Sequence, residues 1–331
     1  MIEKDRFIPI RIQKNHALLK RIAKNHPKRL VIESEQTRRI AGYKGEQAID
    51  FHLSKLPEKE FLIFHDLRLS SGKHFFQIDT LILHPAFALI LEVKNYGGTL
   101  YFDPDFNQLI QTNTKGEVKG YPNPIEQARV QCSEMEKWLL KRNINIPVEF
   151  FIIIISKPST ILKTAPGHVK MLQRVLHVQF LLKSIEKIKA AHKKEDLSPK
   201  HMKKISRSLL KDHTPKSFDI LKHYEISTSE IQTGVICRVC SSYPMKRHYG
   251  TWFCTKCQTK EKNAHISALM DLFLLNNDSP LNNRQICSFL HISSGDIAKK
   301  LLSASKLRCS GSKKGRVYLP KPDYQQIKDL E

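Results

Sequence analysis

The sequence predicts an α/β protein with a mixed sheet, followed by two smaller modules near the C-terminus. Three observations lead to this prediction. Residues 42–156 change between helical and strand patterns in the order helix, three strands, helix, strand. Four cysteines then stand as two closely spaced pairs, and residues 264–320 are typical of three short helices and a hairpin. A chain of 331 residues has room for two or three such domains.

The first predicted helix covers residues 42–56, and Pro57 ends it. Small or apolar side chains recur there at helical spacing, at Ala48, Ile49, Leu53 and Leu56. Three apolar runs follow at 61–69, 74–83 and 88–96, and the turn sequences SSGK and HPAF separate them. These runs are predicted to be strands.

The rest of the sheet domain is predicted from a hairpin, a helix and a buried strand. Residues 99–111 are typical of the hairpin. The helix is expected over 123–143, with Asn123 as its N-cap and Pro124 at its first position. Residues 148–156 are almost entirely apolar, which is typical of a strand in the middle of a layered α/β sheet.

The charge balance indicates a polyanionic partner. Lys and Arg number 55 against 32 Asp and Glu, which gives a formal net charge of +23. Such an excess favours a nucleic acid over an anionic membrane surface, although a merely soluble basic surface is the alternative. No apolar stretch is long enough to span a membrane, and the N-terminus lacks the apolar core of a signal peptide. We therefore expect a cytoplasmic protein with no membrane partner, whose cysteines are thiols or metal ligands.

Three charged residues interrupt the apolar hairpin: Asp79, Glu92 and Lys94. Glu92 and Lys94 share one face of their strand because side chains alternate. If the strands pair through HPAF, Asp79 lies near Glu92. Two such carboxylates repel one another unless a cation sits between them, and Mg²⁺ is a suitable hard cation. A lysine beside them can orient water or offset charge on an attacked phosphate.

This pattern predicts metal-assisted phosphodiester hydrolysis. Glu46, on the helix before the strands, is a candidate extra ligand. The alternative is that Glu92 and Lys94 form only a surface ion pair on an edge strand, because Glu-x-Lys is a common sequence.

The sequence pieces GYKGEQAIDFHLSKL, FQIDTLIL, LILEVKNYGGTL and NPIEQ resemble the NERD family, the nuclease-related domain. That family is similar to the PD-(D/E)XK nucleases, whose core has the predicted element order. The resemblance implies that Asp79 and Glu92 hold a catalytic Mg²⁺ or Mn²⁺ and that Lys94 is the catalytic lysine. It also implies that Glu46 is the helical acid and Gln127 the polar residue of the following helix. Ile78 replaces the proline that usually precedes the aspartate in NERD sequences.

Cys237, Cys240, Cys254 and Cys257 are predicted to bind one structural Zn²⁺. They form two Cys-x-x-Cys pairs separated by thirteen residues, a spacing that can close a tetrahedral four-thiolate site. The segment resembles the zinc ribbons attached to topoisomerases and other nucleic-acid enzymes. The zinc could contact nucleic acid through a basic exterior, or it could only fold this short segment.

Residues 264–322 have the element order of a winged helix-turn-helix: three helices and then a basic hairpin. In that arrangement the helix from Ser294 enters the DNA major groove and the hairpin is the wing. The predicted DNA contacts are Lys299, Lys300 and Ser303 on the helix, and Lys313, Lys314 and Arg316 on the wing. The alternative is a protein-interaction module, since winged helices also pair proteins.

These readings divide the chain into five segments. They are a basic N-terminal extension (1–40), a NERD nuclease-like domain (41–180), a basic helical linker (181–232), a zinc ribbon (233–260) and a winged-helix-like domain (264–322). Between residues 183 and 216 there are eleven Lys or Arg against four acids. Such a run is either a solvated helix face with a linker or a surface along a phosphate backbone.

The predicted function is Mg²⁺- or Mn²⁺-dependent hydrolysis of DNA, with the C-terminal modules supplying DNA binding. One alternative is a non-catalytic DNA-binding or regulatory protein that uses the nuclease fold as a scaffold, because a fold does not fix a function. A second is RNA as the ligand, since neither basic charge nor a zinc ribbon separates DNA from RNA.

Overall fold

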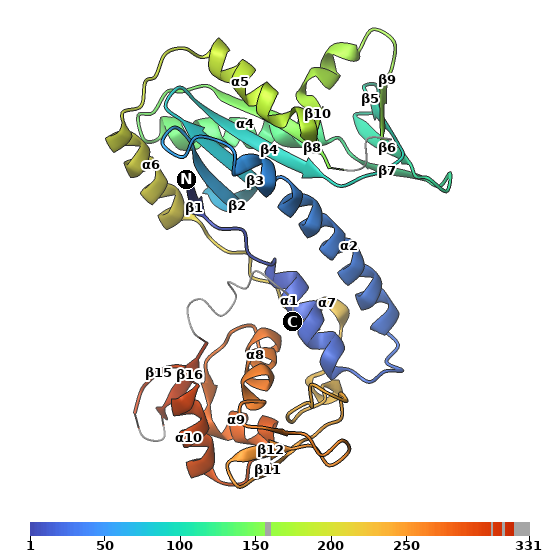
Figure 1. Ribbon diagram of the computed structural model, residues 1–331, viewed down its shortest axis with the longest axis vertical. Coiled ribbons are helices and arrows are strands. Elements are labelled where there is room, and N and C mark those ends of the chain that lie inside the picture. The colour runs from blue at the N-terminus through green and yellow to red at the C-terminus, as the bar shows by residue number, and fades with distance from the viewer. Residues whose placement is uncertain (156–159, 306, 313–314, 321–331) are drawn as a thin grey trace. The chain divides into compact units, whose positions relative to one another are not determined.

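The computed structural model describes residues 1–155, 160–305, 307–312 and 315–320 (Figure 1). The chain forms two compact units. Unit 1 consists of residues 1–6 and 40–216, and unit 2 of residues 7–39 and 217–331. These boundaries differ from the five predicted segments, because both units combine residues from the N-terminal region with residues far along the chain. Within the described part of the chain, no helix has the length and apolar character needed to cross a membrane.

Unit 1 is built around a six-stranded mixed sheet in the order β1-β2-β3-β4-β8-β10. Strands β2, β3 and β4 are antiparallel, whereas β1 joins β2 in parallel and β8 lies parallel to both β4 and β10. The strands are β1 (Ile2–Lys4), β2 (Leu62–Ser71), β3 (His74–His84), β4 (Phe87–Lys94), β8 (Val148–Ile154) and β10 (Val175–His177). The predicted order of helix, three strands, helix and strand is confirmed, and so is the mixed α/β class.

A second, four-stranded sheet in unit 1 has the order β7-β6-β5-β9. Its strands are β5 (Thr99–Asp103), β6 (Gln108–Thr112), β7 (Val118–Pro122) and β9 (Ile161–Thr164). The sequence predicted only the β5–β6 hairpin. Strand β7 is largely exposed, so the burial pattern that marks the other strands in the sequence is absent there.

Helices cover both faces of the six-stranded sheet. They are α3 (Asp50–Leu53), α4 (Pro124–Leu140), α5 (Leu181–Ala191) and α6 (Pro199–Asp212), with short 3₁₀ turns at Val169–Arg174 and Val178–Phe180. Helix α2 (Arg29–Ala48) has its first part in unit 2 and its last part in unit 1. Asn123 caps α4 by accepting a hydrogen bond from the Ile125 amide, as predicted. Helix α2 begins at Arg29, earlier than predicted, and the Arg29–Glu33 and Glu35–Arg39 pairs one turn apart stabilise its polar first half.

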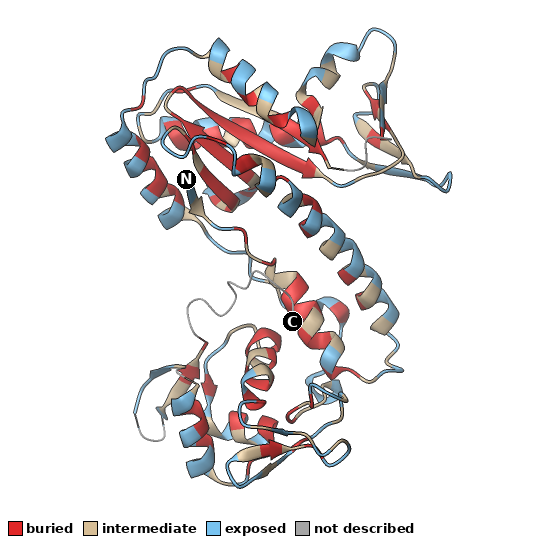
Figure 2. Ribbon diagram, in the orientation of Figure 1, coloured by how far each residue is buried: buried red, intermediate tan, exposed pale blue. Residues whose placement is uncertain are grey.

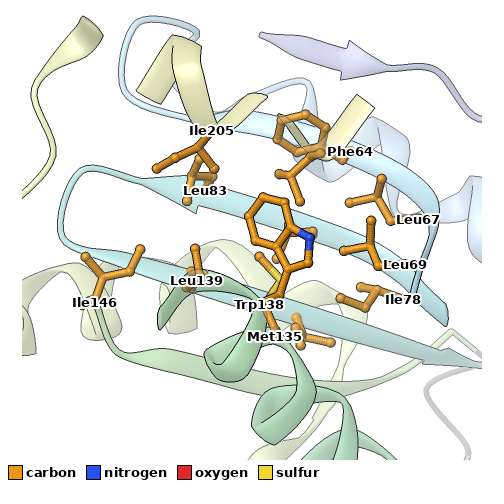
Figure 3. Close-up of a cluster of buried hydrophobic side chains, with 14 of the residues drawn as sticks. Phe64, Leu67, Leu69, Ile78, Leu83, Met135, Trp138, Leu139, Ile146 and Ile205 are labelled. Atoms are coloured by element: carbon orange, nitrogen blue, oxygen red, sulfur yellow. The ribbon is translucent and has the colours of Figure 1, made fainter. Parts of the chain in front are cut away.

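Helices α4 and α6 share one core with the sheet (Figure 3). Met135, Trp138 and Leu139 of α4 meet Leu83 of β3 there, and Ile205 of α6 closes the cluster. Helices α3 and α5 contribute to a different cluster, with the opposite side chains of β4. The segment predicted as a linker therefore packs on both faces of the sheet as far as residue 212, because its apolar side chains recur at helical spacing between the lysines.

Unit 2 joins α1 (Ile10–Arg21) to the C-terminal modules. Its other helices are α7 (Ile220–Tyr224), α8 (His265–Leu275), α9 (Asn283–Leu290) and α10 (Gly295–Ala304), with a 3₁₀ turn at Thr228–Glu230. Its strands are β11 (Lys246–His248), β12 (Thr251–Phe253), β13 (Lys260–Glu261), β14 (Leu281–Asn282), β15 (Arg308–Ser310) and β16 (Val317–Leu319). Arg21 is buried and donates to Asp271 of α8 over 2.8 Å, which fixes α1 inside this unit.

We expect Met135→Ala to lower the free energy of unfolding of unit 1 by about 2–5 kcal/mol, because the side chain is fully buried between α4 and the sheet. Hydrogen exchange of the β3 and β4 amides measures this loss without averaging over unit 2. Val130→Ala on the same helix is the matched control, since Val130 is 61% exposed and should change the exchange free energy by less than about 0.5 kcal/mol. Equal effects of the two substitutions would contradict this packing.

Candidate active site and metal centre

The regular pairing of β2 with β3 is interrupted at Asp66 and Asp79, which hold opposite positions in the register. The register pairs His65 with Thr80 and Leu67 with Ile78, and passes over Asp66 and Asp79 between them. Asp66 has a left-handed backbone (φ 50°). Residues three positions apart on a regular strand point to opposite faces of the sheet, but Ile78 and Leu81 both pack into the same core. The alternation of side chains along β3 is therefore broken between them. The local irregularity turns Asp79 toward β4, where its Oδ2 accepts a hydrogen bond of 3.0 Å from the Val93 amide.

Glu92 is the centre of the site. Its side chain is only 2% exposed, and three side chains donate to it. Lys94 Nζ (2.6 Å) and Gln127 Nε2 (2.7 Å) share Oε1, and Gln131 Nε2 (2.8 Å) binds Oε2. Lys94 also donates to Gln127 Oε1 over 3.3 Å. The structure thus brings together Glu92, Lys94 and Gln127 in one network, and the ion pair is not a surface pair on an edge strand, because β4 lies inside the sheet.

The N-terminal segment reaches the same region through Arg6. This buried guanidinium donates to Glu46 Oε2 at 2.9 Å, to both oxygens of Asp50 at 3.2–3.3 Å, and to Thr80 Oγ1 at 3.0 Å. It also donates to His65 Nδ1 at 2.8 Å. Because an arginine can only donate, His65 accepts through Nδ1 and is the neutral Nε2 tautomer. Arg6 therefore holds Glu46 beside the β3 residue that follows Asp79.

The electrostatics of the site reflect several buried carboxylates. Burial holds the pKa of Asp79 well above its ordinary value, and the charges of Glu92 and Glu46 add to this effect. Burial also raises the pKa of Glu46 to about 7; Arg6 opposes the shift, and Asp66 and Glu92 reinforce it. Burial disfavours the charged Lys94 amine, but the Glu92 carboxylate outweighs this and raises the pKa of Lys94. Lys94 is thus a cation at neutral pH.

The donor set fits a hard divalent cation in chemistry. Carboxylate oxygens are the ligands of Mg²⁺ and Mn²⁺, and none of the described residues donates a hydrogen bond to Asp79 Oδ1. Positive charge near Asp79 would also oppose the repulsion that raises its pKa. However, Asp79, Glu92 and Glu46 are not all within 4.8 Å of one another, since the only such group among the described residues is formed by cysteines.

The four cysteines predicted to bind zinc converge in unit 2. The ligand atoms of Cys237, Cys240, Cys254 and Cys257 lie within 4.8 Å of one another, and the Sγ pairs 237–257 and 240–254 are 3.5 Å apart. Four thiolates around Zn²⁺, with bonds of about 2.3 Å, lie roughly 3.8 Å apart. The arrangement therefore fits one tetrahedral Zn²⁺.

The two cysteine pairs have the same backbone conformation. The amide of Cys237 donates to the Ser242 carbonyl and that of Cys254 to the Thr259 carbonyl, both at 2.9 Å. The residue directly after the second cysteine is left-handed in both pairs: Ser241 has a φ of 55° and Gln258 a φ of 62°. This repeated turn aims two thiols at one point from each side, which is the geometry a four-cysteine zinc site requires.

The cysteine module is not separate from the helices that follow it. Cys237, Cys254 and Trp252 share one apolar cluster with residues of α8, α9 and α10. Trp252 Nε1 also donates to His265 of α8 over 3.2 Å. The predicted zinc-ribbon and winged-helix segments therefore form one core, and zinc is expected to stabilise both.

The residues predicted to contact DNA are only partly described. Lys299, Lys300 and Ser303 are exposed on α10, and Arg316 is half-buried beside β16. Lys313 and Lys314 lie outside the described residues. Strands β14, β16 and β15 form an antiparallel sheet after the three helices. The winged-helix assignment of these elements and its DNA contacts stay predictions.

The family comparison agrees with the geometry of unit 1. Residues 41–155 match the family model NERD, the nuclease-related domain. The resemblance predicted from the sequence is therefore confirmed over this range, which is less than half of the chain. The match indicates a nuclease-related function for these residues. No curated protein and no solved structure matches the chain.

Sequence reasoning missed two residues of the site. Gln131 could have been found, because it stands one helical turn after Gln127 and presents its amide on the same face. Arg6 lies outside the NERD match and gives no local signal, since its six hydrogen bonds go to four residues that are 40 to 74 positions away.

We expect Arg6→Met to lower the free energy of unfolding of unit 1 by about 3–5 kcal/mol, because it leaves Glu46 and Asp50 without their cation. The loss should be near the lower end of this range, since both carboxylates are partly exposed. Hydrogen exchange of the β2 and β3 amides is the measurement. Arg129→Met is the control, because Arg129 is exposed and its one ion pair among the described residues is with Glu126 on its own helix. A loss for Arg6→Met as small as that of the control would contradict the proposed anchoring.

We expect Cys254→Ser to reduce bound zinc from about one ion per chain to almost none, because three thiolates and a hydroxyl bind Zn²⁺ poorly. Elemental analysis of the purified protein measures this directly. Cys309→Ser should retain the metal, since Cys309 is exposed and stands outside the quartet. Full zinc content in the Cys254 variant would exclude this site.

Proposed function

We propose that this protein is a metal-dependent DNA nuclease, and that the active site of its NERD domain hydrolyses the phosphodiester bonds. The observation that carries the proposal is the convergence of Lys94 and Gln127 on the buried Glu92 carboxylate, beside Asp79. Burying a charged carboxylate inside a sheet is costly, and apolar residues would serve a purely structural role better. Such an arrangement is typical of catalytic sites.

In this proposal Asp79 and Glu92 hold Mg²⁺ or Mn²⁺, and the metal supplies Lewis-acid stabilisation of charge on the phosphate. Lys94 remains cationic through its ion pair and offsets negative charge that develops at the scissile phosphate. Gln127 is exposed on the first turns of α4 and orients both Glu92 and Lys94. Glu46, held by Arg6, is the third acid near the site.

The DNA-binding part of the proposal assigns affinity to unit 2. The zinc-stabilised module and α10 expose lysines, and a chain of net charge +23 suits a phosphate backbone. Lys299, Lys300 and Ser303 would face the DNA, with Arg316 from the hairpin. RNA remains a competing ligand that the same charges could bind.

A second candidate is a non-catalytic nucleic-acid-binding protein, and one observation favours it. Both Glu92 oxygens already accept hydrogen bonds from side chains, and the three acids do not gather within 4.8 Å of one another. An enzyme would have to exchange at least one of these hydrogen bonds for the metal, whereas a scaffold would keep the network closed.

We expect metal-dependent cleavage of labelled DNA by the wild type with Mg²⁺ or Mn²⁺. Lys94→Gln should lower kcat by about 10²–10³-fold, because it removes a preorganised positive charge, and Asp79→Asn should lower it at least as much. Electrophoresis of single- and double-stranded substrates measures the rates. Glu136→Gln is the control, because Glu136 is exposed toward the other end of α4.

The two candidates give different results in this assay. Cleavage that both variants lose while DNA binding stays intact supports the nuclease. A wild type that binds DNA but does not cleave it with either metal supports the scaffold. Cleavage that survives in both variants would show that the site has been placed on the wrong residues.

A further inference from the structure

Helix α6 presents five cations in one stripe, which we call the α6 stripe: Lys200, Lys203, Lys204, Arg207 and Lys211. All five are exposed. Because an α-helix turns by about 100° per residue, they fall within an arc of roughly 100°. The stripe is about 16 Å long from its first to its last residue at 1.5 Å per residue. Over such a length, duplex DNA carries about ten phosphate charges.

The opposite face of α6 is used for packing. Its buried residues are Met202, Ile205, Ser206 and Leu209, and they face the core that α4 shares with the sheet (Figure 2). Two further hydrogen bonds fix the end of the helix. Trp138 Nε1 donates to Asp212 Oδ2 (3.1 Å), and the Thr214 amide donates to the Arg68 carbonyl (2.9 Å). The stripe therefore stands on a rigid element of unit 1 rather than on a linker.

The stripe has no internal counter-charge. Several other cations on the helices of unit 1 have an acidic partner, as Lys137 of α4 has in Glu134 and Lys189 of α5 has in Glu60. Within the described part of the chain, none of the five stripe residues forms an ion pair with an acid. Five like charges on one face repel one another, so a packed helix that keeps them without acids is expected to meet external negative charge.

The α6 stripe lies on the same side of the sheet as the candidate active site. Gln127 and Gln131 in the first half of α4 bind Glu92, and Trp138 near its other end binds Asp212 of α6. The residues of α4 between Gln127 and Trp138 span about 16 Å. A ligand long enough to follow α4 could therefore touch both the site and the stripe.

We propose that the α6 stripe binds the phosphate backbone of double-stranded DNA and holds it across the NERD domain. The choice of DNA rests on the proposed nuclease function; the binding surface itself rests on the geometry of α6. A groove of about 520 Å³ between α6 and residues 142–146 places His201 and the amides of Asn143 and Asn145 beside Lys204 of the stripe. Arg142 and Asp196 also line this groove, and the Asp196 carboxylate is paired with Lys194. The histidine and the two amides can donate further hydrogen bonds to phosphate.

Two other polyanions fit the stripe less well. A membrane-binding amphipathic helix inserts its apolar face into lipid, whereas the apolar face of α6 is buried in protein. Proteins that bind single strands stack unpaired bases on aromatic side chains, and the stripe has no Phe, Tyr or Trp. What remains is a sequence-independent contact with the regular backbone of a duplex.

The test measures DNA binding by the full chain with Asp79→Asn, so that cleavage does not interfere. The probe is a fluorescent duplex of about 30 base pairs, roughly three helical turns, titrated at several KCl concentrations. The stripe variant combines Lys200→Gln, Lys204→Gln and Lys211→Gln. Loss of three phosphate contacts should weaken binding and reduce the slope of log Kobs against log salt by about 2–3.

The matched control combines Lys183→Gln, Lys187→Gln and Lys193→Gln. These lysines are exposed and belong to the same unit, and their substitution removes the same charge. Lys183 and Lys187 lie on α5, which packs on the other face of the sheet, and Lys193 follows that helix. The control should change the slope by less than about 1, because it alters only the long-range field. A second stripe variant with Lys→Arg at the same three positions keeps the charge and should bind as the parent does.

Each outcome decides the proposal. A smaller slope in the stripe variant alone, restored by arginine, supports it. Equal slopes in the stripe variant and the control overturn it. The assignment to DNA is overturned if the stripe binds an RNA duplex but does not bind DNA. It is also overturned if the stripe binds anionic phosphatidylserine vesicles but does not bind DNA. If wild-type protein binds DNA through the stripe but never cleaves it, the stripe stands and the nuclease proposal fails.

Discussion

A carboxylate buried in the middle of a sheet is the constraint on which unit 1 depends. Glu92 is almost inaccessible to solvent, so its two oxygens must find donors within the protein. Lys94 comes from the same strand, but the other two donors come from α4. The position of α4 along the sheet is therefore set by hydrogen bonds to one carboxylate as well as by the apolar contacts of Met135 and Trp138 farther along the helix.

The same constraint links the site to parts of the chain outside the NERD match. Helix α4 carries the site at its first turns and the contact with α6 near its other end. Arg6 joins the N-terminal segment to Glu46 and Thr80. A buried arginine is costly to desolvate, and the six hydrogen bonds of Arg6 compensate for that cost only when all of them form together. Residues 1–6 and 181–216 are thus integral parts of unit 1.

The sequence predicted those features that depend on local spacing. The order of the central elements, the Asn123 cap and the four-cysteine cluster follow from periodicity, capping preference and ligand spacing, and each is confirmed. Features that depend on distant contacts escaped prediction. Nothing near Arg6 in the sequence indicates that it is buried, and the lysines of 183–216 concealed the apolar faces of α5 and α6. The break in alternation at Asp66 and Asp79 was also hidden, because it arises from one left-handed residue within a regular pattern.

The division of the chain between two units has a consequence for biosynthesis. The chain passes from one unit to the other three times, after Arg6, after Arg39 and after Lys216. Unit 1 has all its residues once Lys216 has left the ribosome. Unit 2 cannot fold until the C-terminal modules have been synthesised, because α1 packs against α8. During translation the apolar face of α1 is made early and covered late, which leaves it exposed to chaperones or to wrong partners in the meantime. A single proteolytic cut between the units would leave them joined by the two remaining connections, so neither unit is an independent fragment of the sequence.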